Sequence, residues 1–450
     1  MQLIKTQMLA ASILLISSNL AWAKATPDEI SRLGKDLTPI GAEAAGNKEG
    51  TIPPWTGGLT KAPAGFDVKK GYADPFAGEK PLFTITAANA EEHKDKLSVG
   101  QIAMLKKYPT FKVNVYKTYR TAAYPERVYE DLKKYAGTAE LSADGVVGSG
   151  SSTVPFPFPK KGQEVLWNHS LRWRGGGTVR DYNWHTVNSN GASYKVAFRE
   201  EWLYESLGFL DTKRDNAAFV IKGTWTEPAT LVGTIYLAWD NLDMSKQARQ
   251  GWIYNAGQRR VRRAPELCCD FIAEGTDGLR FTDQHDAWNG TTERYDWKLV
   301  GKKEMYIPYN VYKLTDKSLK ASQVLQKGHI DPELMRYELH RVWVVEGTLK
   351  AGARHVIAKR TMYIDEDTWQ VAMADLYDAR GQLWRYQDGS MAQFYDAQVP
   401  WYSAYTIHDL ISGSYILNQT TFDTNTTWKF GVKGKLSDFE PDELRRQGTK

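Results

Sequence analysis

Short runs in which apolar or aromatic side chains alternate with polar ones dominate the chain from residue 163 onward. In one example, residues 369–375 lead through a turn at 378–381 into a second run at 383–387. A period of two is typical of β-strands, and successive runs joined by short turns predict an antiparallel meander. We therefore expect mainly antiparallel β structure with some helices (α+β), folded as a large curved sheet or half-barrel.

Aromatic residues are numerous and lie mostly within these runs. The chain of 450 residues contains 16 Trp, 24 Tyr and 15 Phe. Residues 231–239 carry apolar side chains on both faces of the predicted strand, which indicates that both faces are covered. With 42% hydrophobic and 25% charged residues, the composition excludes a disordered chain, a collagen-like repeat and a polytopic membrane protein.

The chain before the sheet changes composition several times. Thr26 and Pro27 predict a helix start, and the stretch after it is rich in Gly and Pro, which predicts an extended strap. Apolar residues at three- and four-residue spacings then predict helices, and the Gly/Ser and Pro/Phe runs that follow are typical of a connector. We expect one compact unit with five segments: a strap with a short helix (24–86), a helical segment (87–136), a flexible connector (137–162), the antiparallel half-barrel (163–430) and a C-terminal tail (431–450).

The first 23 residues have the pattern of a cleavable signal peptide. Lys5 supplies a positive charge, Met8–Leu20 is largely apolar, and Ala21-Trp22-Ala23 has the small-x-small pattern that signal peptidase requires. The apolar run is too short to span a bilayer, and no Cys lies near the cleavage point for lipid attachment. We therefore expect residues 1–23 to be removed and the mature protein to be secreted, soluble and not lipidated.

The two cysteines, Cys268 and Cys269, are adjacent in sequence. A vicinal pair meets the geometry of a disulfide poorly, so at most one strained bridge is possible, and the pattern favours two small, partly buried side chains. The C-x-x-C spacing of redox sites and the Cys and His spacings of zinc sites are absent. The eight histidines also lack metal-ligand spacing, so the sequence predicts neither a metal nor a cofactor.

Signatures of common enzymes are missing. The chain has no G-x-S-x-G, no H-E-x-x-H, no G-x-G-x-x-G after a strand and no P-loop, and we predict no catalytic residue. Asp283, Asp286 and Glu293, interleaved with Trp288 and Tyr295, nevertheless have the residue types of a glycosidase site. The same residues are also typical of turns, which is the favoured interpretation. A periplasmic enzyme or binding module that acts on an envelope glycan is therefore the alternative function.

The densest basic cluster consists of Arg259, Arg260, Arg262 and Arg263. On a strand, Arg259 and Arg263 would face one side and Arg260 and Arg262 the other. A nucleic-acid site needs a continuous basic face with aromatic stacking groups, so we expect no nucleic acid as partner. The cluster is either a solvated strand or a contact with an anionic surface, such as a lipid headgroup or the acidic rim of a partner protein.

Several segments of the sequence resemble a known family. They are Leu33–Glu43, Ile52–Gly58, Gly275–Gly278 and Asp375–Asp378. Together they resemble the proteobacterial family called DUF1329, which is grouped with outer-membrane lipoprotein-sorting proteins of the LolA/LolB type. Trp252-Ile253-Tyr254 followed by Arg260-Val261-x-Arg263 is similar to the strand-turn-strand pattern of the sorting proteins. The resemblance implies a half-barrel that encloses a lipid beneath a helical lid in the periplasm. It also implies an inner-membrane exporter of the resistance-nodulation-division type and an outer-membrane component as partners.

The physical chemistry of a lipid in water agrees with this implication, because each exposed methylene costs about 0.8 kcal/mol unless a cavity encloses it. We therefore predict a soluble periplasmic carrier or chaperone, without enzymatic activity, that binds a lipid or other hydrophobic molecule in the curved sheet. The resemblance implies transfer of that molecule between the exporter and the outer membrane. The predicted cavity lining is Trp239, Trp252, Tyr254, Trp343, Met373 and Trp384, and the predicted headgroup contacts are Arg259, Arg260, Arg262 and Arg263.

Overall fold

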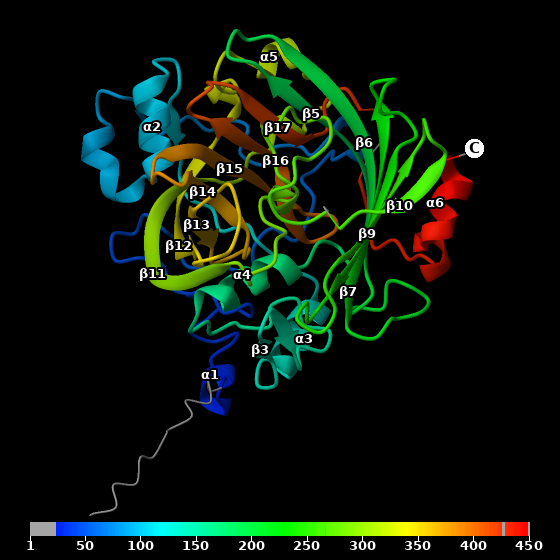
Figure 1. Cartoon of the computed structure of the whole chain (residues 1–450). Helices are drawn as coiled ribbons and strands as arrows, with labels where there is room; N and C mark the ends of the chain where they lie inside the picture. Colours follow the sequence, from blue (N-terminus) through cyan, green and yellow to red (C-terminus); the bar gives the residue numbers. More distant parts are fainter. Residues whose placement is uncertain (1–23, 266, 425–427, 449–450) are drawn as a thin grey trace, which may run out of the picture.

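The computed structural model describes residues 24–448, except residues 266 and 425–427. The predicted signal peptide, residues 1–23, lies outside the described residues. The described strands, apart from one small hairpin, belong to one sheet of 16 strands that curves around a central space (Figure 1). The predicted fold class, a mainly antiparallel and open curved sheet with few helices, is confirmed.

The sheet consists of two antiparallel meanders, each of which runs in chain order. In the first, Asn188–Gly191 forms the predicted hairpin turn next to the pair Val187↔Ser193. The last strand of the second meander joins the first strand of the first meander through Tyr415↔Val187. The first meander contains β5 (Gly177–Val187), β6 (Ser193–Tyr204), β7 (Ala217–Glu227), β8 (Ile235–Asn241), β9 (Gln250–Asn255) and β10 (Arg260–Arg263). The second contains β11 (Tyr295–Pro308), β12 (Tyr337–Leu349), β13 (Lys359–Asp365), β14 (Val371–Tyr377), β15 (Leu383–Phe394), β16 (Val399–Asp409) and β17 (Tyr415–Thr420).

Short strands extend the margins of this sheet. β1 and β2 pair with each other and join β12 through a single parallel bridge, and β18 pairs with β5. β3 and β4 form the separate hairpin. Their bounds are β1 (Phe83–Ile85), β2 (Val113–Val115), β3 (Glu140–Ser142), β4 (Gly145–Val147) and β18 (Lys429–Phe430).

The order of the strands forces one long connection through the inside of the sheet. β10 and β11 follow each other in the chain, but they lie at opposite ends of the double meander. Residues 264–294, which we call the crossing segment, therefore run from one end to the other across its inner face. Trp184 of β5 donates to the Gly275 carbonyl at 2.8 Å, and Arg385 of β15 donates to the Leu279 carbonyl at 3.0 Å. The crossing segment thus contacts strands of both meanders.

Helices cover other faces of the sheet. α6 packs against β8, β9 and β10, α2 packs against β14 and β15, and α4 packs against β11 and β12 (Figure 1). The α-helices are α1 (Pro27–Ser31), α2 (Val99–Lys107), α3 (Glu126–Tyr135), α4 (Gly162–Leu171), α5 (Ala321–Val324) and α6 (Pro441–Gly448). The 3-10 helices are η1 (Val68–Lys70), η2 (Ala90–Lys96), η3 (Thr282–Gln284), η4 (Lys313–Thr315), η5 (Pro332–Leu334) and η6 (Leu436–Phe439).

Two helix starts show how local sequence sets these elements. At α1 the Thr26 side chain accepts from the Glu29 N–H, and the Glu29 carboxylate accepts from the Thr26 N–H, which is a capping box at the predicted position. Ser98 and Gln101 form the same box at α2. The Asp375 carboxylate of β14 also accepts from two N–H groups in the first turn of α2, at 3.1 and 2.9 Å. This contact ties α2 to the sheet.

Helix α4 is the main element that the sequence pattern did not reveal. We placed the start of the sheet at residue 163, whereas the structure has a helix over 162–171 and the first long strand only from Gly177. Most side chains of α4 are buried, including the polar Asn168 and His169. A helix that is buried all round lacks the amphipathic period that a sequence analysis detects. The predicted connector likewise contains the β3–β4 hairpin.

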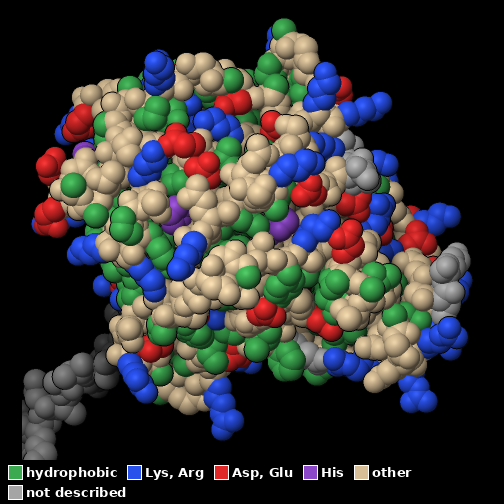
Figure 2. Space-filling model, turned by 90° about the horizontal axis from the view of Figure 1, so that it is seen from above, with side chains coloured by type: hydrophobic (Ala, Val, Ile, Leu, Met, Phe, Trp, Pro, Cys, Tyr) green, Lys and Arg blue, Asp and Glu red, His purple; other side chains and the backbone are tan. Residues whose placement is uncertain are grey.

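The surface carries mixed charge. On the face shown in Figure 2, Lys and Arg side chains lie among Asp, Glu and hydrophobic side chains. This distribution agrees with a formal net charge of only +5 on the whole chain. In the described part of the chain, no helix combines the length and the apolar character needed to cross a bilayer.

A substitution at Leu444 tests whether the packing of α6 on the first meander stabilises the protein. Its side chain is fully buried in a cluster with Trp252 and Tyr254. We expect Leu444→Ala to lower the free energy of unfolding by about 2 to 5 kcal/mol in urea denaturation. The matched control is Leu82→Ala, because Leu82 is 67% exposed. Equal stability of the two variants would contradict the packing of α6.

Candidate functional site

A pocket lies between the first meander and the crossing segment. Its volume is about 310 Å³, at the lower end of the range of small-molecule sites. Aromatic side chains from β5 to β8 form one wall, and the crossing segment forms the other. The lining residues are Tyr182, Trp184, Phe198, Ile221, Trp225, Tyr236, Ala238, Arg249, Ile253, Arg262, Leu267, Phe271, Ile272, Ala273, Glu274, Arg280, Thr282, His285 and Asn289.

The aromatic wall is continuous across four strands. The Phe198 ring stacks on Tyr236 at a centroid distance of 5.7 Å and meets Trp225 edge-on at 5.1 Å and Trp184 at 5.3 Å. Gly223 makes this packing possible, since a Cβ there would lie 2.1 Å from the Phe198 ring and 2.3 Å from the Tyr236 ring. The glycine in the middle of β7 therefore provides room for the wall that faces the pocket.

Three of the predicted lining residues lie on the opposite face of the first meander. Trp239 and Trp252 pack edge-on at 4.6 Å, and Trp239 donates to the Phe439 carbonyl at 2.8 Å. Tyr254 belongs to the same cluster, beneath α6. The pocket is lined instead by their neighbours Ala238 and Ile253. Both faces of these strands are apolar, so alternation alone did not indicate which face is the inner one.

The other three predicted lining residues lie in the second meander. Trp343 is near Trp369, at a centroid distance of 6.3 Å. Met373 is fully buried in the cluster that contains residues of α2, and Trp384 donates to Asp409 at 2.8 Å. None of these lines the pocket described above. A role of any of the six residues in ligand binding stays a prediction.

The basic cluster divides between the two faces of β10, as alternation predicted. Arg262 lines the pocket, and Arg260 is exposed on the same strand. The Arg263 guanidinium lies 5.5 Å from the centre of the Trp252 ring, on the other face. Arg259 has a left-handed φ of 52° in the turn before the strand. Contact of these arginines with a headgroup stays a prediction.

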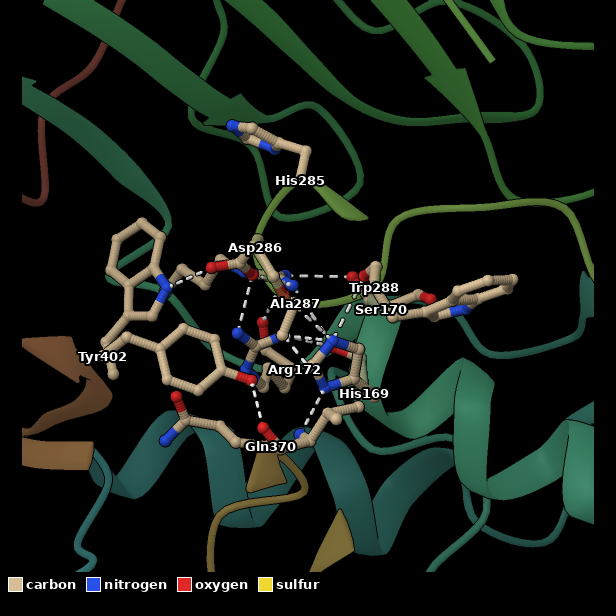
Figure 3. A network of polar contacts seen from close by, with 12 residues as sticks. His169, Ser170, Arg172, His285, Asp286, Ala287, Trp288, Gln370 and Tyr402 are labelled. Atoms are coloured by element: carbon tan, nitrogen blue, oxygen red, sulfur yellow. Dashed lines mark hydrogen bonds and ion pairs between the residues drawn. The ribbon is translucent and has the colours of Figure 1, made fainter. Parts of the chain in front are cut away.

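A buried charge network holds the crossing segment in place (Figure 3). The Asp286 carboxylate accepts from Arg172 at 2.6 Å, from Arg174 at 2.8 Å and from the Trp401 indole at 2.6 Å. His169 of α4 lies within 3.1 Å of the Trp288 carbonyl. Burial alone would raise the pKa of Asp286, but the adjacent guanidinium groups hold it far below its usual value. In Figure 3 the neighbouring His285 points away from this network.

The backbone at this anchor is in a conformation that side chains disfavour. Asp286 and Ala287 have φ values of 54° and 68°, the left-handed region. Such positions cost about 1 kcal/mol or more each unless surrounding contacts hold them. The fully buried ion pairs of Asp286 are the contacts that hold this turn.

A second carboxylate anchors the segment nearby. Asp283 accepts from Arg360 at 2.5 Å and from His355 at 3.0 Å, and although burial would raise its pKa, these partners lower it. Arg360 also lies over the rings of Trp288 and Tyr295, at 4.8 and 5.2 Å.

These contacts bear on the glycosidase alternative. A general acid needs a raised pKa, and sugar-binding aromatic residues need an open face. Asp283 and Asp286 are instead ion-paired anchors with lowered pKa values, while Glu293 is exposed.

The family of the chain can now be stated. A model of the DUF1329 family, described as a protein of unknown function, matches residues 84–445. The chain belongs to the DUF1329 family. The match includes both meanders and the crossing segment. A Pseudomonas aeruginosa protein, described as uncharacterized, is 45% identical to this DUF1329 protein over 452 residues, which is 100% of this chain and 99% of the relative.

Three solved structures are similar to this DUF1329 protein. One, described as an outer membrane lipoprotein-sorting protein domain from Vibrio parahaemolyticus, has a TM-score of 0.44 and 14% identity over 63% of this chain and 97% of its own. A DUF1329 family protein from Desulfovibrio piger has a TM-score of 0.42 and 14% identity, over 60% and 92%. A LolA superfamily protein from Nitrosomonas europaea has a TM-score of 0.39 and 13% identity, over 63% and 100%.

A buried ion pair that no sequence motif indicated lies beside the pocket. Glu200 of β6 accepts from Arg180 at 2.5 Å and from His285 at 2.8 Å. Burial alone would raise the pKa of Glu200, but these partners lower it to about 2. A signal was available, because Glu200 shares a strand face with Phe198 and Trp202. A carboxylate within an aromatic face indicates a buried partner.

One group of residues in this DUF1329 protein has the types of a metal site. Among the described residues, His340, Asp365 and Asp367 bring ligand atoms within 4.8 Å of one another. Arg120, however, donates to both carboxylate oxygens of Asp367, at 2.8 and 2.6 Å. A guanidinium therefore already neutralises this carboxylate. The two cysteines, Cys268 and Cys269, are free thiols in the crossing segment.

The ion pairs of Asp286 should make a large contribution to the free energy of unfolding. Asp286→Asn leaves two buried guanidinium groups without their carboxylate, so we expect the free energy of unfolding to fall by about 3 to 5 kcal/mol. Asp277→Asn is the matched control, since Asp277 is an exposed residue of the same segment. Urea denaturation measures both. If Asp286→Asn were no less stable than the control, the anchoring role would be wrong.

The buried carboxylate of Glu200 makes the free energy of unfolding depend on pH. The carboxyl of an unfolded Glu has a pKa near 4.5, whereas the folded value is about 2. The stabilisation is therefore present above about pH 4.5 and is lost as the pH falls toward about 2. Between about pH 5 and about pH 2.5, wild type should lose about 2 kcal/mol more than Glu200→Gln. Parallel pH profiles of the two proteins would contradict this assignment.

Proposed function

We propose that this protein is a periplasmic carrier that binds a lipid or other hydrophobic molecule in the pocket between the first meander and the crossing segment. The observation that carries the proposal is the continuous aromatic wall of Trp184, Phe198, Trp225 and Tyr236, which faces a cavity of about 310 Å³. Removing a ligand's apolar surface from water against such a wall is favourable by about 25 cal/mol per Å².

The mouth of the pocket supports a role in transfer. Phe271 and Ile272 of the crossing segment line the pocket, yet they are 56% and 57% exposed. Large apolar side chains exposed at such a position are typical of surfaces that contact a membrane or a partner. Arg260 of the adjoining sheet edge is exposed. We therefore propose that this mouth receives its ligand from an inner-membrane exporter and delivers it toward the outer membrane.

A second hollow is less suited to an apolar ligand. A groove of about 670 Å³ lies between the N-terminal strap and α3. Its lining includes Glu126, Glu130 and Lys133 on α3, so a bound acyl chain would lie beside charged groups. The aromatic pocket is the better candidate, because it faces a ligand mainly with apolar side chains.

Native mass spectrometry of protein purified from the periplasm without detergent tests the proposal. We expect a mass above that of the bare polypeptide, and organic extraction should release the extra mass. The extracted protein should also bind a fluorescent fatty-acyl probe. A bare polypeptide that fails to bind the probe would show that the carrier function is wrong.

A substitution that fills the pocket tests its location. Ala238 lines the pocket from β8, so Ala238→Trp places an indole where the ligand would lie. We expect at least about a tenfold loss of affinity for the fluorescent probe. Ala88→Trp, at an exposed position before η2, is the control and should bind as wild type does. Unchanged binding by Ala238→Trp would place the ligand elsewhere, for example in the groove beside α3.

A further inference from the structure

The described residues include nine buried arginines, and eight of them have a carboxylate within 4.0 Å. Arg180 with Glu200 and Arg360 with Asp283 are examples, each at 2.5 Å. Arg280 of the crossing segment is the exception. It is 8% exposed and lines the pocket, and no described carboxylate lies within ion-pair distance of it.

The surroundings of Arg280 offer only weak compensation for its charge. The guanidinium lies 5.3 Å from the centre of the Trp184 ring and donates to the Tyr405 hydroxyl at 3.4 Å. Its Nε atom is buried and has no hydrogen-bond partner. An aromatic ring and one long hydrogen bond replace only part of the hydration that a guanidinium loses on burial.

The carboxylate of Glu200 binds other donors than Arg280. Its Oε2 accepts from Arg180, and its Oε1 accepts from His285 at 2.8 Å. The hydroxyls of Tyr182 and Tyr236, which line the pocket, also donate to Oε1 at 3.3 and 3.2 Å. These four donors occupy both oxygens of Glu200, so no carboxylate among the described residues balances Arg280.

We propose that the ligand of this pocket carries a single carboxylate at the end of an acyl chain and that Arg280 binds this carboxylate. The inference rests on the proposed carrier function and names the class of its ligand. A guanidinium offers parallel N–H groups that match the two oxygens of a carboxylate. The acyl chain would then lie along the aromatic wall.

The other charges at the pocket favour one anionic group over several. Arg249 also lines the pocket, but it donates to Asp240 at 2.6 Å and to the Asn289 side chain at 2.9 Å. It therefore has its own carboxylate. Arg262 and Glu274 also line the pocket, but both are exposed. A ligand with one negative charge balances Arg280, whereas a headgroup with several charges would need further cations at the same depth.

A series of ligands with one chain length tests this inference on extracted wild-type protein. Isothermal titration calorimetry compares dodecanoate, 1-dodecanol and dodecyltrimethylammonium, the two ions below their micelle concentrations and the alcohol below its solubility limit. We expect dodecanoate to bind about tenfold or more tightly than the alcohol, and the cation to bind most weakly. Failure of all three to bind would overturn the carrier function itself. Equal binding of the acid and the alcohol would overturn only the role of Arg280.

Variants assign the preference to Arg280. Arg280→Gln should bind dodecanoate about as weakly as it binds 1-dodecanol, because the charge is gone while the aromatic wall remains. Arg380→Gln, in the exposed turn before β15 and away from the pocket, is the control and should keep the preference. A preference for dodecanoate that survives in Arg280→Gln would overturn the assignment.

Thermal unfolding of the empty proteins separates ligand binding from a structural role. Arg280 lacks an ion pair, so Arg280→Gln should unfold at the wild-type temperature or above it. Arg360→Gln breaks a buried ion pair and should unfold well below it. A strongly destabilised Arg280→Gln would show that Arg280 is structural and would overturn the inference.

Discussion

The ion pairs of Asp286 with Arg172 and Arg174 hold the chain inside its own sheet, and the site depends on them. Because β10 and β11 lie at opposite ends of the double meander, residues 264–294 must cross the inner face. A segment without regular structure can be buried there only if its polar groups are bound. Asp286 and Asp283 form ion pairs with guanidinium groups from distant parts of the chain. These ion pairs fix the position of the crossing segment against the inner face of the sheet.

This arrangement explains why the curved sheet is partly filled and partly hollow. The crossing segment and α4 occupy the inner face near β11 to β16, where Asp286 contacts Trp401 and His169 contacts the Trp288 carbonyl. Near β5 to β9 the crossing segment does not pack directly on the whole face of the sheet, and a pocket remains between them. The wall of that pocket is aromatic, and Arg280, which is buried without a carboxylate partner among the described residues, gives it a polar end. A cavity with these two properties suits an amphiphile.

Alternation along the sequence predicted the strands and turns but did not indicate which face of each strand lines the pocket. The turns at 188–191 and 378–381 and the covering of both faces of β8 were all expected. The predicted lining, in contrast, named Trp252 and Tyr254, which pack beneath α6, while Ile253 between them faces the pocket. Both faces of these strands are apolar, and a shift of one residue exchanges them. Only α6 and the crossing segment decide which face is inside.

The sequence by itself determined the class of the protein. Period-two runs and short turns require an antiparallel sheet, and motifs along the chain indicated the DUF1329 family. The tertiary structure decided which residues meet at the pocket and which of their charges are paired. Asp286 and Arg172 are more than a hundred positions apart, as are Arg280 and Tyr405, and no local pattern relates them. Whether a buried charge is paired depends on which strands lie beside it, and that follows from the order of strands in the sheet. The ion pair at Asp286 and the uncompensated charge of Arg280 are therefore properties of the fold.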